Sequence, residues 1–283
     1  MSIDKIGLGT VQFGLNYGIS NKLGQTSFKD SLEIVIQAKH NGINLLDTAS
    51  SYGNSEIILG KMKLNEMKIV SKFISNNSKD LKIEFQNTLN RLNCKGLYGY
   101  LCHRPENVLS DNSLWSVLEE FRCLGKIKKI GFSFTDPDQI DKCLRLKIIP
   151  DIVQVPFNIF DQRFLNGIKI LKSKFGTEIH TRSVFLQGLF FLKPEKLMGK
   201  TKIFKNYLIE LNKVCENSND KIIRYALNYC TSNHYIDKVI VGIQSTSQMN
   251  DLLTYSKYSN PNKFKYPIVI ENKLKKYLDP ANW

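Results

Sequence analysis

The segment LLDTASSYGNSE, residues 45–56, gives the first indication of both a fold and a reactive site. Two leucines precede Asp47, as at the end of a buried strand, and a turn of small polar residues then leads to Tyr52. An acid and a phenol at the carboxyl end of a strand need partner side chains from the rest of the chain in order to act as catalysts. We therefore ask which fold this strand belongs to, and which side chains meet Asp47 and Tyr52.

Short apolar runs rich in β-branched residues recur along the chain, with helical patterns between them. We expect eight strands, at residues 5–10, 44–48, 68–73, 97–102, 128–134, 152–157, 178–185 and 238–243. Eight parallel strands close a (β/α)8 TIM barrel, which takes about 250 residues, and this chain has 283. No linker or shift in composition divides the chain. The sequence therefore predicts an α/β fold with a single barrel domain over residues 1–283.

The composition is that of a globular protein, with 42% hydrophobic and 23% charged residues. The first residues lack the pattern of a signal peptide, and no apolar run approaches the eighteen or so residues that a membrane helix needs. The six cysteines include no CxxC pair, which favours free, mostly buried thiols over disulfides or a zinc site. We expect a cytoplasmic protein without a metal and without a membrane partner.

The formal net charge is +14, with an isoelectric point near 9.4. Such a charge fits nucleic acid, a membrane surface or an anionic small molecule. The lysines are spread along the chain and are not gathered in one arm, so we do not expect a nucleic-acid partner. A phosphorylated cofactor or substrate fits the charge equally well.

Four side chains of complementary chemistry fall at or near successive strand ends: Asp47, Tyr52, Lys72 and His103. In a barrel these ends meet at the face where active sites are built. A neighbouring ammonium stabilises a phenolate, a carboxylate keeps that ammonium charged, and an imidazole can donate a hydrogen bond to a carbonyl oxygen. Taken singly, each residue has an ordinary explanation as a cap, a turn residue or a solvated charge. Their coincidence favours general acid catalysis.

The chain resembles the aldo-keto reductase superfamily over nearly its whole length. The matching segments are GLGTVQFG, LLDTASSYG, IVSKF, YLCHRPE, GFSF, VQVPFN, SVFLQGLF and VGIQSTSQMNDLL, in the order of the family. The resemblance implies a (β/α)8 barrel that binds a nicotinamide cofactor without a Rossmann motif. It also implies that Tyr52 donates the proton, that Lys72 and Asp47 tune the pKa of Tyr52, and that His103 orients the carbonyl.

The same resemblance implies a set of cofactor-binding residues. Ser133 and Gln154 match positions that bond the nicotinamide carboxamide, and Thr10 matches one beside the nicotinamide ribose. Further matches, toward the pyrophosphate and the adenosine end, are Ser183, Phe185, Gln187, Gly242, Ile243, Gln244, Ser245, Gln248 and Asp251.

The chain departs from the family pattern at several of these positions. Phe134 stands where an Asn is usual, and Leu252 replaces an adenine-binding Asn. Arg182 replaces the aromatic residue that commonly stacks on the nicotinamide, and its flat guanidinium can stack instead. Gln248 stands in place of the 2′-phosphate arginine. By family habit we expect NADPH, with NADH left open.

The implied reaction is reversible hydride transfer between the nicotinamide and a small carbonyl or alcohol substrate. The polar segment 12–27 and the basic segment 193–205 are expected to face that substrate. Their character favours a sugar, including a nucleotide-activated sugar of glycan or polysaccharide biosynthesis. Two alternatives stay open: a non-catalytic barrel that binds cofactor and regulates, and a redox-assisted sugar isomerase or lyase. The oligomeric state is not readable.

Overall fold

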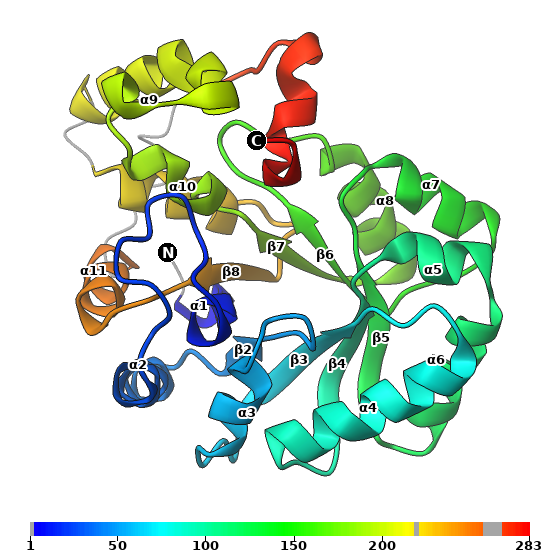
Figure 1. The fold of residues 1–283 in the computed structure, drawn as a ribbon. Coiled ribbons are helices and arrows are strands. Elements are labelled where there is room, and N and C mark those ends of the chain that lie inside the picture. The colour runs from blue at the N-terminus through cyan, green and yellow to red at the C-terminus, as the bar shows by residue number, and fades with distance from the viewer. Residues whose placement is uncertain (1–2, 218–220, 257–267) are drawn as a thin grey trace.

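Among the residues that the structure describes, eight parallel strands pair in chain order around a closed barrel (Figure 1). The structure is a computed structural model that describes residues 3–217, 221–256 and 268–283. The strands are β1 (Ile6–Gly9), β2 (Leu45–Asp47), β3 (Lys68–Phe73), β4 (Leu97–Cys102), β5 (Ile127–Ser133), β6 (Ile152–Pro156), β7 (Glu178–Arg182) and β8 (Lys238–Gly242). The pairing of β8 with β1 closes the barrel, with Gly9 opposite Gly242. The predicted (β/α)8 barrel is confirmed.

Helices surround the strands on the outside of the barrel (Figure 1). They are α1 (Val11–Gly14), α2 (Phe28–His40), α3 (Ser55–Gly60), α4 (Ser78–Leu92), α5 (Pro105–Ser110), α6 (Ser113–Cys123), α7 (Asp138–Arg145), α8 (Leu165–Phe175), α9 (Lys205–Asn217), α10 (Ile222–Thr231) and α11 (Thr246–Ser256). The local sequence sets their ends. Ser27, for example, accepts a hydrogen bond from the amide of Asp30 at the start of α2, and Gly42 takes a positive φ just beyond its end.

Most predicted strand bounds agree with the structure to within a residue, but the expected strand at residues 178–185 is shorter. The strand β7 ends at Arg182 because Ser183 has φ +62°, in the left-handed region that extended backbone does not use. Leu186 and Gln187 also have positive φ values. The residues after Arg182 therefore form a turn and a 3₁₀ helix, η2 (Leu186–Phe191).

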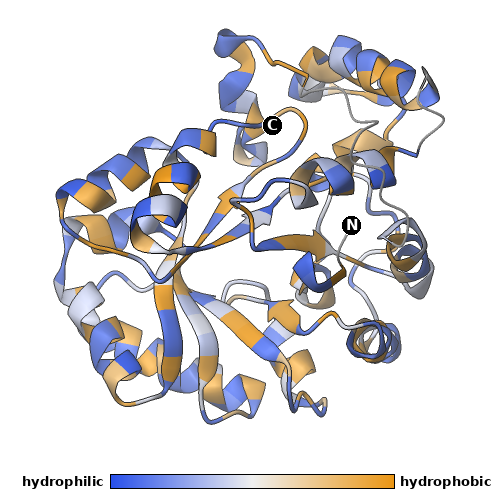
Figure 2. Cartoon of the chain, turned by 180° about the vertical axis from the view of Figure 1, so that it is seen from behind, coloured by the Kyte–Doolittle hydropathy of each residue, from blue (hydrophilic) through white to orange (hydrophobic). Residues whose placement is uncertain are grey.

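Two apolar layers hold the barrel together. Side chains inside it form a small cluster, made of Leu45, Val70, Leu101, Ile152 and Ile240. A much larger cluster lies between the outer faces of the strands and the helices. In Figure 2 the strands carry hydrophobic stretches interrupted by hydrophilic or neutral residues, and the helices alternate around their turns between hydrophobic and hydrophilic residues. This alternation is the pattern of a helix with one face on a core.

The described part of the C-terminal tail, residues 268–283, packs at the carboxyl end of the strands. The amide of Ile268 donates to the carbonyl of Ile159, which follows β6. The indole ring of Trp283 meets the ring of Phe204, in η4 (Gly199–Phe204), edge to face. The described part of the tail therefore packs across one end of the barrel, and residues 257–267 lie outside the described part of the chain.

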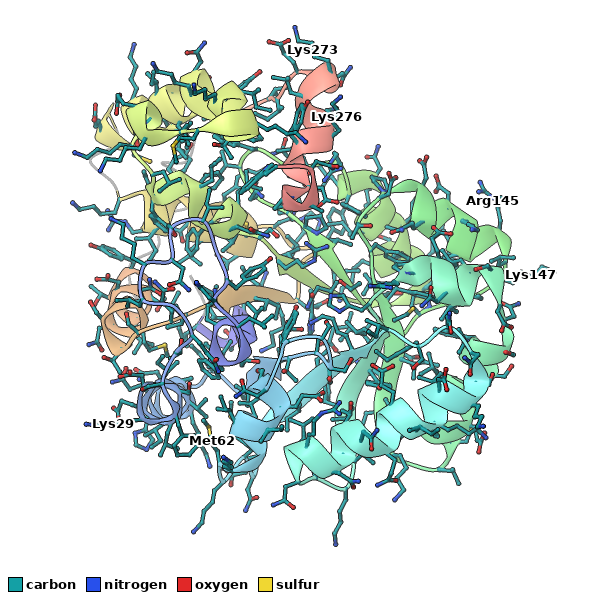
Figure 3. All side chains as sticks on the ribbon, viewed as in Figure 1. Lys29, Met62, Arg145, Lys147, Lys273 and Lys276 are labelled. Atoms are coloured by element: carbon teal, nitrogen blue, oxygen red, sulfur yellow. The ribbon has the colours of Figure 1, made fainter. Side chains whose placement is uncertain are left out.

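The basic charge is dispersed over the surface. The labelled basic residues of Figure 3 project outward from different sides: Lys29 from α2, Arg145 and Lys147 at the end of α7, and Lys273 and Lys276 from the tail. The six cysteines form no disulfide bond with one another, and four of them are buried. Within the described ranges, no helix is long and apolar enough to cross a membrane.

Candidate active site at the carboxyl end of the barrel

The interior residues of the barrel explain where the candidate site lies. Side chains on a strand alternate between its two faces, so a residue two positions beyond an interior residue also points inward. Asp47, Lys72 and His103 each lie two positions after a member of the interior cluster, as do Gln154 and Gly242. The carboxyl ends of five different strands therefore converge on one space.

Lys72 and Asp47 form a buried ion pair at the centre of this space. The Lys72 ammonium lies 2.9 and 2.8 Å from the two carboxylate oxygens of Asp47. It also donates to the carbonyl of Thr48 and lies 3.4 Å from the hydroxyl of Tyr52. The carboxylate accepts a further hydrogen bond of 2.8 Å from the side-chain amide of Gln154. The predicted acid, lysine and phenol are therefore in direct contact.

The ion pair keeps the buried ammonium charged. Burial alone lowers the pKa of Lys72, but the negative charge of Asp47, the Tyr52 hydroxyl and their hydrogen bonds outweigh it. The pKa of Lys72 is therefore raised above its ordinary value. The ammonium also lies 4.9 Å from the centroid of the Tyr52 ring. A permanent positive charge thus stands beside the phenol.

His103 lies on the other side of Tyr52. The two rings meet edge to face, with centroids 5.8 Å apart. Burial lowers the pKa of His103, and the positive charges of Lys72, Arg182 and Arg104 lower it further, to about 3. The imidazole is therefore neutral at physiological pH. Its Nδ1 lies 3.1 Å from the hydroxyl of Ser51.

Two glycines allow the backbone to hold Tyr52 in this position. A Cβ at Gly14, the last residue of α1, would lie 1.7 Å from the carbonyl oxygen of Tyr52. A Cβ at Gly53 would lie 2.4 Å from the carbonyl of Gly14, and Gly53 also has φ +55°. Larger residues at either position would push the loop and the phenol away from Lys72.

A cavity of about 410 Å³ extends from Asp47 and Tyr52 toward α11. Eleven of the thirteen predicted cofactor residues line it: Thr10, Gln154, Arg182, Ser183, Phe185, Gln187, Gly242, Ile243, Gln244, Gln248 and Asp251. The other two, Ser133 and Ser245, do not line it, but each adjoins a residue that does. Ser133 pairs with Gln154 in the sheet, and the Ser245 hydroxyl accepts from the amide of Gln248. Leu252, one of the departures from the family pattern, also lines the cavity.

Two buried amide oxygens in the cavity wall lack a hydrogen-bond partner among the described residues. They are Oε1 of Gln154 and Oε1 of Gln12. An orphaned buried acceptor costs free energy unless a bound group supplies a donor. Gln12 packs against Gly242, where a Cβ would come within 2.8 Å of the Gln12 amide. Both glutamines are therefore suited to contact a ligand with amide or hydroxyl donors.

Arg182 is held in the cavity wall by neutral acceptors. Its guanidinium donates to the carbonyl of Phe134 over 3.2 Å and lies 3.4 Å from the Ser183 hydroxyl. The Phe134 side chain stacks on Phe132 and is fully buried. Phe134, which stands where the resemblance implies an Asn, is thus a residue of the core and supports Arg182 through its carbonyl.

The loop after α1 is fastened across the cavity. We call residues 15–24 the strap; in Figure 1 it runs from α1 toward α2. The Gln187 side-chain amide donates to the Tyr17 hydroxyl over 2.6 Å, and the Ile19 amide donates to the Gln187 carbonyl over 3.1 Å. Tyr17, Ser20 and Asn21 line the cavity. The expectation that residues 12–27 face the site is consistent with this arrangement.

Sequence reasoning expected residues 12–27 to face the site but did not single out Gln12 or Tyr17, and the cavity does not reach residues 193–205, which were also expected to face the substrate. Within the described part of the chain, Phe191 lines the cavity but none of residues 193–205 does. Phe204 packs instead with Phe160 beneath the tail. The segment reads as polar, but its one large aromatic residue belongs to the core. No group of three metal-ligating side chains was found among the described residues.

The chain matches a known family and several known proteins. The family model described as "Aldo/keto reductase family" matches residues 5–263. The aldo-keto reductase YhdN of Bacillus subtilis (strain 168) is 30% identical over 181 residues, which cover 58% of this chain and 53% of that protein. The NADH-specific methylglyoxal reductase of Escherichia coli (strain K12) is 25% identical over 218 residues, covering 67% of this chain and 66% of the relative. The matches thus span about half to two thirds of these curated relatives.

Solved structures share the fold. The aldo-keto reductase AKR11C1 from Bacillus halodurans, in its holo form, superposes with a TM-score of 0.73 at 18% identity, covering 95% of this chain and 94% of that one. The glycerol dehydrogenase AKR11B4 from Gluconobacter oxydans gives a TM-score of 0.69 at 18% identity, covering 98% and 90%. At this identity the likeness extends to the barrel alone.

Proposed function

Because this chain belongs to the aldo/keto reductase family, we propose that it is an NAD(P)H-dependent oxidoreductase that interconverts a small carbonyl compound and its alcohol. The observation that carries the proposal is the contact of Lys72 with both Asp47 and Tyr52 at the mouth of the barrel. A buried, charged lysine beside a phenol serves proton transfer, and a purely structural barrel has no need for it.

The described residues fit a nicotinamide dinucleotide. The orphaned acceptor of Gln154 lies beside Asp47 and suits the amide donor of a carboxamide, while the cavity leads on to Gln248 and Asp251. We propose that Gln154, Thr10 and Arg182 hold the nicotinamide end, and that the residues after β7 and β8 hold the phosphates and the adenosine. The bound cofactor supplies or accepts the hydride.

We assign the proton chemistry to the side chains in contact. Tyr52 donates its hydroxyl proton to the carbonyl oxygen during reduction and takes it back during oxidation. Lys72 stabilises the phenolate that remains, and Asp47 keeps Lys72 charged. The neutral His103 donates a second hydrogen bond to the same oxygen. These four residues are the proposed catalytic set.

The identity of the dinucleotide is open to two proposals. NADPH is the expectation from family habit. One observation favours NADH: the far end of the cavity is lined by the neutral Gln248 and the carboxylate of Asp251. A carboxylate there repels a 2′-phosphate and accepts hydrogen bonds from free ribose hydroxyls. One relative is named as NADH-specific.

We propose a polar, sugar-like carbonyl substrate of glycan or polysaccharide biosynthesis. The support is the polar surface that Tyr17, Ser20 and Asn21 contribute to the cavity. A panel of aldoses, ketoses, nucleotide-activated sugars and aromatic aldehydes tests the proposal, and activity confined to the aromatic aldehydes would rule it out.

The first experiment is a fluorescence titration of the purified protein with NADPH and, in parallel, NADH, followed by the carbonyl panel. Binding of either cofactor with stoichiometric oxidation by a carbonyl supports the proposed reaction. Binding with substrate turnover but no net change in the cofactor would favour a redox-assisted isomerase or lyase. Binding without any turnover would favour a regulatory barrel, and binding of neither would exclude the proposed site.

A further inference from the structure

Ser51 is a polar residue of the site to which the proposed reaction assigns no role. It is the residue before Tyr52 in the chain, and its hydroxyl lies 3.1 Å from Nδ1 of His103. The His103 backbone is fixed by a 2.9 Å bond from its amide to the carbonyl of Phe73. Among the described residues, the second ring nitrogen, Nε2, has no hydrogen-bond partner, so it is free to meet a ligand.

We propose that Ser51 is a positioning residue that donates its hydroxyl hydrogen to Nδ1 of His103 and so keeps the ring proton on Nε2. The Nε2–H then points its donor at the substrate oxygen that Tyr52 protonates. This inference rests on the proposed carbonyl chemistry, but the position of the proton can be measured without turnover.

The direction of the Ser51–His103 bond follows from the chemistry of a neutral imidazole. One of its nitrogens carries a hydrogen and the other can only accept. A serine hydroxyl can donate to a bare Nδ1 or accept from a protonated Nδ1, so the bond by itself allows both tautomers. A proton on Nδ1 would leave a lone pair on Nε2, which repels a carbonyl oxygen. A proton on Nε2 gives the oxygen a donor, and this arrangement needs Ser51 to donate.

The surroundings of His103 keep the ring neutral, so the tautomer matters. Burial lowers the pKa of the ring most, and the positive charges of Lys72, Arg182 and Arg104 lower it further. A doubly protonated ring would have a donor on both nitrogens and would need no partner to set its tautomer. A neutral ring carries only one proton, so a neighbouring group must select the nitrogen that holds it. Ser51 is in contact with Nδ1 and can make this selection.

The loop that carries Ser51 is well anchored. The amide of the preceding residue, Ser50, donates to the carbonyl of Lys72 over 3.0 Å, and its hydroxyl donates to Glu84. Glu84 also accepts from the amides of Ile74 and Ser75, beyond the end of β3. The serine hydroxyl is therefore presented by a fixed backbone, which is what a tautomer-setting contact requires.

Imidazole ¹⁵N NMR on the histidine-labelled protein tests the assignment directly. The chain has only four histidines, and a His103→Gln variant identifies the signals of His103. We expect a neutral ring with the hydrogen on Nε2 from pH 5 to 8 in the wild type and in Ser51→Thr, and a mixture of tautomers in Ser51→Ala. A hydrogen on Nδ1 in the wild type, or an unchanged ring in Ser51→Ala, would overturn the proposal.

Kinetics on the same variants give a second readout. Loss of one hydrogen bond predicts a kcat about 5–10-fold lower in Ser51→Ala, with recovery to within about twofold in Ser51→Thr. Ser116→Ala, which removes an exposed serine of α6, is the control and keeps the wild-type kcat. Equal losses in the Ala and Thr variants would point to a steric effect and would contradict a role for the hydroxyl.

A Ser51→Asp variant reverses the polarity of the contact. The carboxylate raises the pKa of His103 and draws its last proton to Nδ1, so kcat should fall as the pH rises through the new pKa. Absence of this added alkaline loss would contradict the proposal. If the wild type carries its proton on Nε2 but reduces no carbonyl, the proposed function fails while the assignment of the hydrogen bond stands.

Discussion

At the scale of single residues, the site depends on a charge that is taken fully out of water. The Lys72 side chain has no exposed surface, and its salt bridge with Asp47 is among the most buried contacts in the described chain. Removing one partner of such a pair is expensive because it leaves the other charge buried and unpaired. The ion pair therefore ties the stability of the barrel to its chemistry, and the two can be separated by mutation.

A Lys72→Met variant should lose about 3–5 kcal/mol in its free energy of unfolding, because Asp47 is left charged and buried. The double variant Asp47→Asn, Lys72→Met should recover much of this loss while it remains inactive, since no cation stands beside Tyr52. Chemical denaturation and steady-state assays measure the two effects. Recovery of activity in the double variant would contradict the role given to Lys72.

A Tyr52→Phe variant removes the proposed proton donor and little else. We expect kcat to fall by about 10²–10⁴-fold, the usual contribution of a general acid, with a dissociation constant for the cofactor within about twofold of the wild type. Cofactor titration accompanies the assay as the check on folding. A large loss of cofactor affinity at unchanged kcat would speak against this assignment.

The residues of the candidate site could be predicted where the neighbouring sequence shows their position in the fold. Asp47, Lys72 and His103 follow apolar runs, so their place at strand ends is visible in the sequence. The bond from Gln154 to Asp47 joins residues 107 positions apart, and no local pattern indicates it. The close approach of Gly14 to Tyr52 is likewise a property of the folded backbone.

At the scale of elements, the strap forms part of the cavity wall, through Tyr17, Ser20 and Asn21. Residues 15–24 form no helix or strand, and among the described residues the strap is joined to η2 by two hydrogen bonds with Gln187. Gln187 itself has φ +53°, so the strap is fastened to a strained segment. We therefore expect a dinucleotide to pass between these two elements as it enters or leaves the cavity.

A Tyr17→Phe variant should release the cofactor faster. The change removes the acceptor of the 2.6 Å bond from Gln187, and loss of one hydrogen bond of about 1 kcal/mol corresponds to an off-rate about fivefold higher. Stopped-flow displacement of the bound cofactor measures the rate. An unchanged off-rate would show that the strap does not limit cofactor release.

The periodic elements were easier to predict than the connections. The barrel strands are almost continuous in apolar character, and eight of them indicate the fold. The strap and residues 193–205 lack periodicity, so only their polarity was available as a guide. Residues of the strap line the cavity, whereas Phe204 packs against Trp283 of the tail, about 80 residues further along the chain, a contact that no local pattern indicates.

At the scale of the whole molecule, a second charged cluster is found at the opposite end of the barrel from the candidate site. Glu178, the first residue of β7, accepts from Tyr98 over 2.6 Å and pairs with His180 and Lys129. Burial alone raises the pKa of Glu178, but the hydrogen bonds and charges of His180, Lys129 and Tyr98 outweigh it and lower the pKa. This carboxylate therefore joins strands β4, β5 and β7.

A Glu178→Gln variant should lose stability at neutral pH and approach the wild type in acid. A carboxyl whose pKa is lowered on folding stabilises the protein above its unfolded pKa of about 4.3, and that contribution is lost as the pH falls toward the folded pKa. We expect a loss of about 2 kcal/mol at pH 7, from hydrogen bonds to charged groups, that shrinks below about pH 4. Urea denaturation across this range measures it, and a constant difference would contradict the linkage.

The pairing of β8 with β1 has a consequence for how the protein is made. During synthesis β1 emerges early, but its neighbour β8 (Lys238–Gly242) is the last of the eight strands to emerge. Until then β1 and β7 present open edges that can pair with other chains. We expect the growing chain to remain without cofactor and to need shielding by chaperones until β8 has left the ribosome. A stop codon placed before β8 should therefore yield aggregates and not a smaller enzyme.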